Sequence, residues 1–198
     1  SIKIVNNDFR YVSDYGVEVW DNPMVYTYIH NNLFNIFNGF QFDPLMEGKK
    51  GIYVHNSTKN QVTSNNNGST TTISGNIIKN YRFGIHTMNQ EYGQVSDNTI
   101  LFDVPDQYLD YQLPVRRAGI NFQNTNNISV ATNTVRRIQT NIDPSMIDNS
   151  AFLNLGTLIC GFNVDMSNNS YKENLSFNFP THYRIANTCD FSIFECND

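Results

Sequence analysis

Polar and aromatic side chains recur at fixed distances after a glycine in this 198-residue chain. The unit is a glycine followed by alternating apolar and polar residues, as in GVEVW from Gly16 and GIHTM from Gly84. The polar or aromatic positions of these units are Glu18, Trp20, Tyr53, His55, His86, Asn121, Gln123, Asn163 and Asp165. Planar rings stack on sugars, and amides and carboxylates bind hydroxyl groups. We interpret the set as a candidate carbohydrate-binding face, although each member alone is better explained as an ordinary outward polar residue.

Three basic residues, Lys49, Arg82 and Arg117, each stand two positions before such a glycine. If the units stack, the three charges lie close together, and a carboxylate would stabilise them, because arginine pairs with carboxylates in bidentate fashion. A uronate of an acidic polysaccharide fits this role, and pairing with Asp14 is the alternative. His86, with Arg82 and Arg117, is then a candidate catalytic set for β-elimination of a uronate, as base and electrostatic stabilisers.

Three aspartates, Asp103, Asp106 and Asp110, offer oxygen ligands for Ca²⁺. Their spacing matches no EF-hand, and a solvated loop is the alternative interpretation. The sequence has no zinc-ligand spacing, no glycine-rich phosphate loop and no G-x-S-x-G nucleophile turn. We therefore predict no cofactor other than this candidate calcium ion.

A second repeat explains how these side chains are positioned. Its pattern is apolar-x-x-Asn-x-apolar, with the asparagine at Asn7, Asn32, Asn76, Asn98, Asn133 and Asn174. Asparagine tolerates the left-handed conformation that a sharp turn needs, and identical stacked asparagines form hydrogen-bonded ladders. The glycine supplies permissive backbone at another corner. The alternation after the glycine predicts a strand with residues such as Val17 and Ile52 facing the core.

Two repeats in phase resemble the right-handed parallel β-helix of the pectin-lyase-like class. The resemblance implies an all-β fold, a right-handed single-stranded parallel β-helix of about six coils with long loop insertions. It covers residues 1–178; residues 179–198 are expected to form a C-terminal cap or the start of a further coil. We expect the chain to be a segment of a larger protein. An antiparallel β-sandwich is the alternative fold.

The resemblance does not choose a function, because the class includes lyases, hydrolases, epimerases, tailspikes and surface proteins. The polygalacturonase strings N-T-D, D-D, G-H-G and R-I-K are absent; the closest matches are Gly84-Ile85-His86 and Tyr183-Arg184-Ile185. We therefore predict a non-catalytic structural or carbohydrate-contacting surface module. The alternative is a polysaccharide lyase or related enzyme acting on acidic glycans, and a third hypothesis is a piece of a trimeric adhesin.

The composition narrows the partners. The net charge of −5, with only 16% charged residues, argues against nucleic acid, which needs a basic surface. No apolar run is long enough to cross a bilayer. We expect a polysaccharide or cell-surface glycan as partner and a secreted or cell-surface location. The pairing of Cys160, Cys189 and Cys196 and the oligomeric state stay open.

Overall fold

The computed structural model describes residues 1–10, 12, 14–20, 26–35, 48–55, 70–90, 92–102, 117–123, 125, 127–137, 159–164, 170–177, 181–185 and 193–195. All regular structure in these residues is β-strand, arranged as three sheets. Sheet A contains β1 (Ile2–Val5), β4 (Thr27–His30), β7 (Thr71–Ser74), β10 (Gly93–Ser96), β13 (Ile128–Ala131), β16 (Ser170–Lys172) and β19 (Ile193–Glu195). Sheet B contains β2 (Asp8–Arg10), β5 (Leu33–Asn35), β8 (Ile77–Lys79), β11 (Thr99–Phe102), β14 (Thr134–Arg137) and β17 (Leu175–Phe177). Sheet C contains β3 (Tyr15–Trp20), β6 (Gly48–His55), β9 (Tyr81–Met88), β12 (Arg117–Gln123), β15 (Ile159–Val164) and β18 (Thr181–Ile185).

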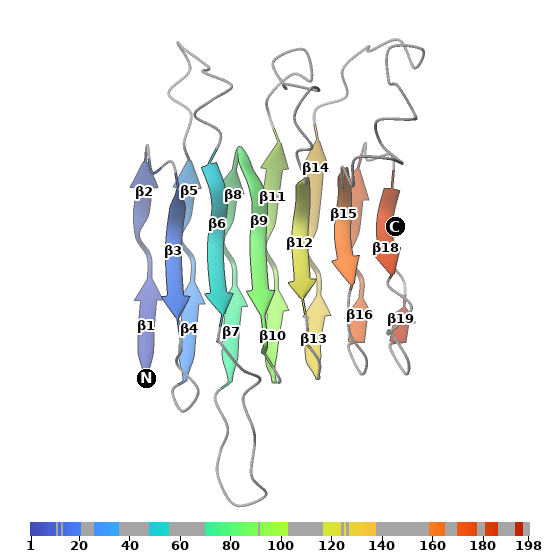
Figure 1. The fold of residues 1–198 in the computed structure, drawn as a ribbon, viewed down its shortest axis with the longest axis horizontal. Helices are drawn as coiled ribbons and strands as arrows, with labels where there is room; N and C mark the ends of the chain where they lie inside the picture. The colour runs from blue at the N-terminus through green and yellow to red at the C-terminus, as the bar shows by residue number, and fades with distance from the viewer. Residues whose placement is uncertain are drawn as a thin grey trace, which may run out of the picture.

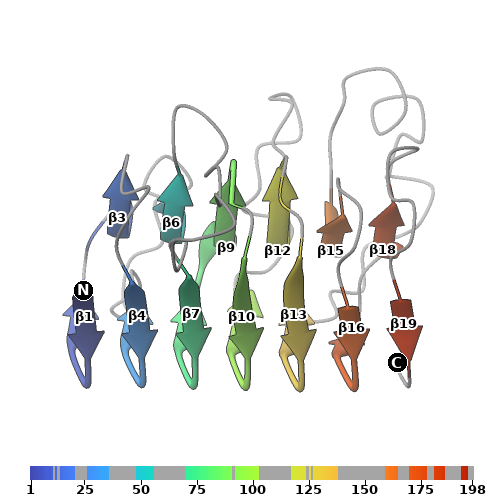
Figure 2. The same cartoon turned by 90° about the horizontal axis from the view of Figure 1, so that it is seen from below.

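The chain visits the three sheets in turn. Every neighbouring pair of strands within a sheet is parallel, and each strand pairs with the strand three places further along the chain. Figures 1 and 2 show the strands of each sheet standing side by side along the long axis, with β1 at one end and β19 at the other. The predicted all-β fold with parallel strands is confirmed, and the antiparallel sandwich is wrong. The arrangement is compatible with a parallel β-solenoid; its hand and number of coils stay predictions.

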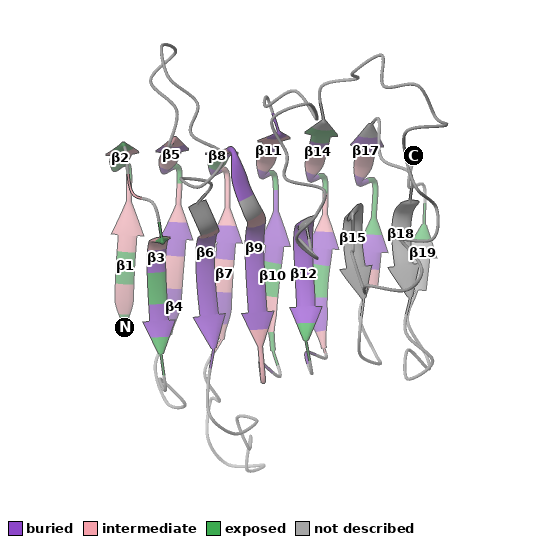
Figure 3. Ribbon diagram, turned by 45° about the horizontal axis from the view of Figure 1, so that its top comes forward, coloured by how far each residue is buried: buried purple, intermediate pink, exposed green. Residues whose placement is uncertain are grey.

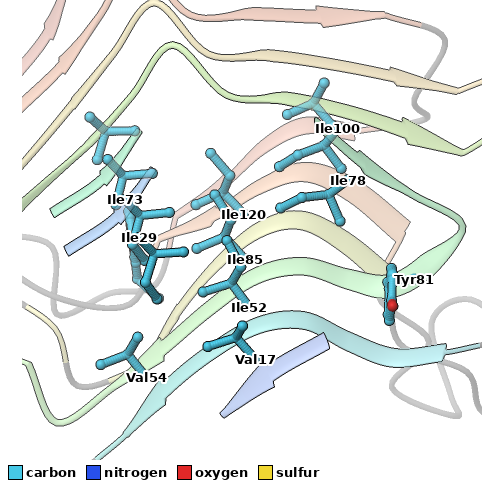
Figure 4. Close-up of a cluster of buried hydrophobic side chains, with 14 of the residues drawn as sticks. Val17, Ile29, Ile52, Val54, Ile73, Ile78, Tyr81, Ile85, Ile100 and Ile120 are labelled. Carbon is cyan, nitrogen blue, oxygen red and sulfur yellow. The ribbon is translucent and has the colours of Figure 1, made fainter. Parts of the chain in front are cut away.

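The core lies between the sheets and consists of vertical files of aliphatic side chains. In sheet C, Val17 pairs with Ile52, Ile52 with Ile85, and Ile85 with Ile120. Ile52, Ile85 and Ile120 are fully buried. Figure 4 shows this file facing isoleucines of the other two sheets. Burying one such side chain stabilises the fold by roughly 1.5–3 kcal/mol. No single turn of chain can bury its own apolar side, so the stack is the stable unit.

The predicted asparagine ladder is present. Each ladder asparagine from Asn7 to Asn133 donates its backbone N–H and its side-chain Nδ2 to Oδ1 of the next asparagine in the stack, at 2.9–3.1 Å. Asn32, Asn76, Asn98, Asn133 and Asn174 are at most 1% exposed. Nδ2 of these five also lies within hydrogen-bond distance of a carbonyl of sheet A, such as Ile73 for Asn98 at 3.0 Å. The ladder therefore satisfies buried backbone groups at the corner between sheets A and B.

The sequence predicted that the ladder asparagine takes the left-handed conformation at this corner. In the structure the residue before it does so. Those residues have φ between 53° and 65°, and they are Asn6, Asn31, Gly75, Asp97, Thr132 and Glu173. The left-handed residue turns the chain sharply. The following asparagine then lies with its side chain buried in the stack. Asparagine at the ladder position is thus required for its hydrogen bonds and not for its backbone conformation.

The glycines before the sheet C strands serve a different purpose from the predicted one. None of Gly16, Gly51 and Gly84 has a positive φ. A Cβ on Gly51 would lie 2.4 Å from Cγ2 of Ile78 and 2.7 Å from the carbonyl oxygen of Gly84. The other two glycines are equally close to a core side chain and to the next glycine carbonyl. Glycine is required here because the backbone of sheet C approaches sheet B too closely for any side chain.

The C-terminal strands continue the sheets. β18 pairs with β15 in sheet C, and β19 pairs with β16 in sheet A. The boundary proposed at residue 178 and the role of the last residues as a cap stay predictions. The described part of the chain contains no helix, and so none long and apolar enough to cross a membrane.

Candidate functional site

The outward positions of sheet C form the two columns that the sequence predicts. Strand register aligns Glu18, Tyr53, His86, Asn121 and Asn163 in one column. It aligns Trp20, His55, Met88 and Gln123 in the other. The selected polar residues that the structure describes thus come together on one sheet, because parallel in-register strands place equivalent positions one above another.

Burial divides these columns in a way that the alternation did not predict. Tyr53, His55, His86 and Asn121 are 6–8% exposed, whereas Trp20 is 65% exposed and Glu18 and Gln123 are also exposed. Figure 3 shows β6, β9 and β12 as largely buried strands. The outward side of sheet C is therefore a packed second layer with an exposed part at Glu18 and Trp20.

A third outward column, missed by the sequence analysis, lies directly before the glycines. It consists of Tyr15, Lys50, Phe83 and Ala118, which strand register places opposite one another. The alternation breaks at the glycine: the Cα–H of Gly16 points toward Phe34 in the core, and Val17 also faces the core. The residue before the glycine therefore faces outward. The aromatic residues Tyr15 and Phe83 directly before the glycines were the signal in the sequence that could have revealed this column.

This column packs against the predicted ones as a cluster of rings. Tyr53 lies 3.9 Å from His55 and 4.9 Å from His86 between ring centroids, and Tyr15 lies 5.8 Å from Tyr53. The Nζ of Lys50 sits 3.1 Å from the centroid of the Tyr53 ring, a close cation–π contact. Burial lowers the pKa of Lys50 to about 8, and the nearby Glu18 carboxylate partly opposes this shift. The cluster holds the rings of β6 rigidly in place.

Glu18 and Trp20 are exposed, and the buried rings of Tyr53 and His55 lie behind them; we define these four residues as the Trp20 platform. The Trp20 ring stacks on His55 with centroids 5.4 Å apart and an interplanar angle of 22°. His55 stacks in turn on Tyr53, and its Nε2 lies 2.9 Å from Oε1 of Glu18. The Trp20 platform thus presents one large ring to solvent, fixed from behind, with a carboxylate beside it. Trp20 is the chain's one tryptophan.

His86 is buried and neutral. It is 6% exposed, and neither ring nitrogen makes a hydrogen bond of standard geometry, although the Gln123 side chain lies close enough to raise its pKa slightly. The pKa of His86 is lowered to about 3, mainly by burial and in part by the charges of Lys50 and His55. A general base works best with a pKa near the working pH. This environment argues against the predicted catalytic base, which stays a prediction together with Arg82 and Arg117.

Backbone register places the three predicted basic residues, Lys49, Arg82 and Arg117. The backbone register that pairs Gly48 with Tyr81 and Lys50 with Phe83 sets Lys49 beside Arg82. Arg117 lies directly before Ala118, which pairs with Phe83. The side chains of these basic residues and of Asn163 lie outside the described part of the structure. So do the whole of Asp165 and the candidate calcium ligands Asp103, Asp106 and Asp110. Among the residues that are described, no group of three or more metal-ligating side chains occurs.

Comparison of the chain with protein-family models, with curated proteins and with solved structures produced no match. The chemistry of the site is therefore argued from its own geometry. A fixed, exposed indole beside a carboxylate can hold the apolar face of a sugar ring and accept hydrogen bonds from its hydroxyl groups.

Proposed function

We propose that this chain is a non-catalytic surface module that contacts carbohydrate, carried outside the cell on a right-handed parallel β-helix similar to those of the pectin-lyase-like class. The observation that supports it best is the Trp20 platform: an indole that is 65% exposed, stacked on His55 and flanked by Glu18. An exposed tryptophan usually loses side-chain entropy on binding. In the Trp20 platform the stack on His55 already restricts the indole, so less side-chain entropy is lost on binding.

The charges of the platform suit hydroxyl groups better than a bare anion. The Glu18 carboxylate is paired with His55 on one side and is 37% exposed by side chain, so it can still accept hydrogen bonds. The cation of Lys50 is directed onto the Tyr53 ring. The platform therefore fits a neutral sugar ring lying on the indole. Binding of a uronate would need the basic side chains of Lys49, Arg82 and Arg117 to take part.

A titration of Trp20 fluorescence tests the proposal directly, because no other tryptophan contributes to the signal. Oligosaccharides of neutral and acidic composition are added to the intact protein, and binding is measured in parallel by calorimetry. We expect Trp20→Ala to weaken binding by about tenfold or more, since a central aromatic anchor dominates such contacts. Ile77→Ala is the matched control, because Ile77 is an exposed apolar residue (43%) on sheet B. Equal affinity of the natural protein and Trp20→Ala would refute the platform.

The non-catalytic part of the proposal needs its own experiment. The protein is incubated with uronic-acid polymers with and without Ca²⁺, and the absorbance of unsaturated products is followed. We expect no turnover. Turnover that disappears in His86→Ala would establish the lyase alternative in its place.

A further inference from the structure

The outward face of sheet A is regular, open and built from small polar side chains over its four central strands, β4, β7, β10 and β13. Strand register aligns Tyr28, Thr72, Gln94 and Ser129 in one outward column. The neighbouring column contains His30 followed by small residues, and Tyr28 and His30 stack on each other with centroids 5.3 Å apart. Figure 2 shows these strands side by side. In contrast to sheet C, this face carries exposed and half-buried positions along its middle.

Two exposed tyrosines mark the start of this face. Tyr26 is 54% and Tyr92 is 39% exposed. The backbone bonds Thr27 N–H to Thr70 O and Thr71 N–H to Tyr92 O place Tyr26, Thr70 and Tyr92 in one column. The two tyrosines are therefore two strand spacings apart, about 9.6 Å along the stack.

The face carries no fixed charge at its centre. In β4, β7, β10 and β13 and the residues directly before them, no described outward position is Asp, Glu, Lys or Arg. The charged outward residues of sheet A lie toward its ends, as with Lys3 on β1 and Lys172 on β16. A polyanion or a charged protein surface would find no complementary group here.

We propose that this face binds an extended, uncharged polysaccharide of β-linked pyranose rings, which lies along the stacking direction with Tyr26 and Tyr92 each against a sugar ring. In a β-1,4-linked polymer of this kind consecutive rings are turned over, so every second ring presents the same face. The tyrosine separation corresponds to the length of two linked rings. Beside the tyrosines, in the next outward column, the hydroxyl and amide groups of Thr72 and Gln94 can bond to sugar hydroxyls. This site is separate from the Trp20 platform on sheet C, and it does not depend on it.

The exposed rings and uncharged polar groups of this face indicate the class of ligand that it binds. Its most exposed rings, Tyr26 and Tyr92, suit the flat apolar faces of sugar rings, and they offer too little apolar surface for a stable contact between two proteins. Its polar groups are uncharged and repeat along the stack, as do the hydroxyl groups of a regular polymer. A linear glycan is therefore the ligand that matches both the spacing and the chemistry.

The test is calorimetric titration of the intact chain with β-1,4-linked glucose oligomers from the disaccharide to the hexasaccharide, and with an oligogalacturonate of equal length. We expect the hexasaccharide to bind at least about tenfold more tightly than the disaccharide, because only the longer chain reaches both tyrosines. Tyr26→Ala and Tyr92→Ala should each weaken hexasaccharide binding by about three- to tenfold, and the double variant in the Trp20→Ala chain should abolish it. The acidic oligomer should bind more weakly than the neutral one.

Each variant is made both in the natural chain and in Trp20→Ala, so that the two sites are measured separately. Hexasaccharide binding that survives Trp20→Ala but not the tyrosine changes supports this inference even if the Trp20 platform binds nothing. Gln94→Glu, at the exposed position two residues after Tyr92 on β10, is a second variant that leaves both rings in place; it should weaken binding similarly.

Three results would overturn the proposal: no hexasaccharide binding by the natural chain, equal binding by the double tyrosine variant when circular dichroism shows it folded, or equal binding of the acidic oligomer. A dimer in sedimentation that dissociates in the double variant would instead assign the face to contact between copies.

Discussion

Replacing Asn98 by alanine should remove more stability than any comparable change at the end of the ladder. Oδ1 of Asn98 accepts from the backbone N–H of Asn76 at 3.1 Å and from its Nδ2 at 2.9 Å. Nδ2 of Asn98 lies 3.0 Å from the carbonyl oxygen of Ile73 and 2.9 Å from Oδ1 of Asn133. Alanine therefore leaves two backbone groups, the N–H of Asn76 and the carbonyl of Ile73, without these partners in a buried place.

The magnitude follows from these lost hydrogen bonds. Leaving the buried N–H of Asn76 without a partner costs about 1–3 kcal/mol, and losing the bonds to Ile73 and Asn133 costs about 0.5–1.5 kcal/mol each, so Asn98→Ala should lower the free energy of unfolding by about 2–6 kcal/mol. Since whole domains are stable by only about 5–15 kcal/mol, this is a large fraction. At an m value of about 2 kcal/mol/M, a loss of 4 kcal/mol moves the urea midpoint by about 2 M.

The assay is urea unfolding followed by circular dichroism, with Asn7→Ala as the matched control. Asn7 ends the ladder, is exposed, and donates to Asn32 without an asparagine above it. We expect this control to lose less than about 1 kcal/mol, the usual net value of a hydrogen bond. Asn98→Asp keeps the shape and the acceptor but brings oxygen against oxygen at Asn133, so it should be at least as destabilising at neutral pH. Equal losses of unfolding free energy in Asn98→Ala and Asn7→Ala would refute the idea that the buried ladder stabilises the fold.

Two further predictions concern the glycine column and the buried histidine. Gly51→Ala should lower the free energy of unfolding by about 1–3 kcal/mol in urea, because its Cβ would lie 2.4 Å from Ile78. The same change should cost less in an Ile78→Ala chain, which the loss of a buried side chain has already destabilised; no loss in the single variant would contradict the steric account. For His86, the folded pKa of about 3 lies below the ordinary value of 6.5, so the unfolded state binds more protons and stability falls as the pH decreases from 6.5 toward 3. This fall reaches at most about 1.4 kcal/mol per pH unit, and His86→Gln should reduce the slope, measured by urea unfolding between pH 7 and pH 4; parallel slopes in the two proteins would refute it.

The stacking order was predictable from the sequence because it depends on repetition alone. Asn76, Asn98 and Asn133 stand at equivalent places of a repeated pattern, and in-register strands bring equivalent places together whatever the detailed backbone. The same reasoning predicted that Ile52, Ile85 and Ile120 share one file of the core. Even the degenerate copy at Asn174 takes its place in the ladder.

The roles within each copy were less predictable. The pattern placed Asn98 at the corner but could not show that Asp97 takes the left-handed turn, since both residue types tolerate it. The pattern also indicated a turn at Gly51, although the actual reason is the approach of Ile78 from another sheet. A contact between segments far apart in the chain leaves no local periodic signal.

The candidate site shows the same division. Its columns were determined by the sequence, because side-chain alternation along a strand is a local property. Only the tertiary structure decided that Tyr15 and Lys50 join the outward side, that His86 is enclosed while Trp20 is exposed, and that Tyr26 and Tyr92 stand in one column. Exposure depends on what packs against a residue from elsewhere, and one irregular residue at the glycine reverses the side on which every preceding residue lies.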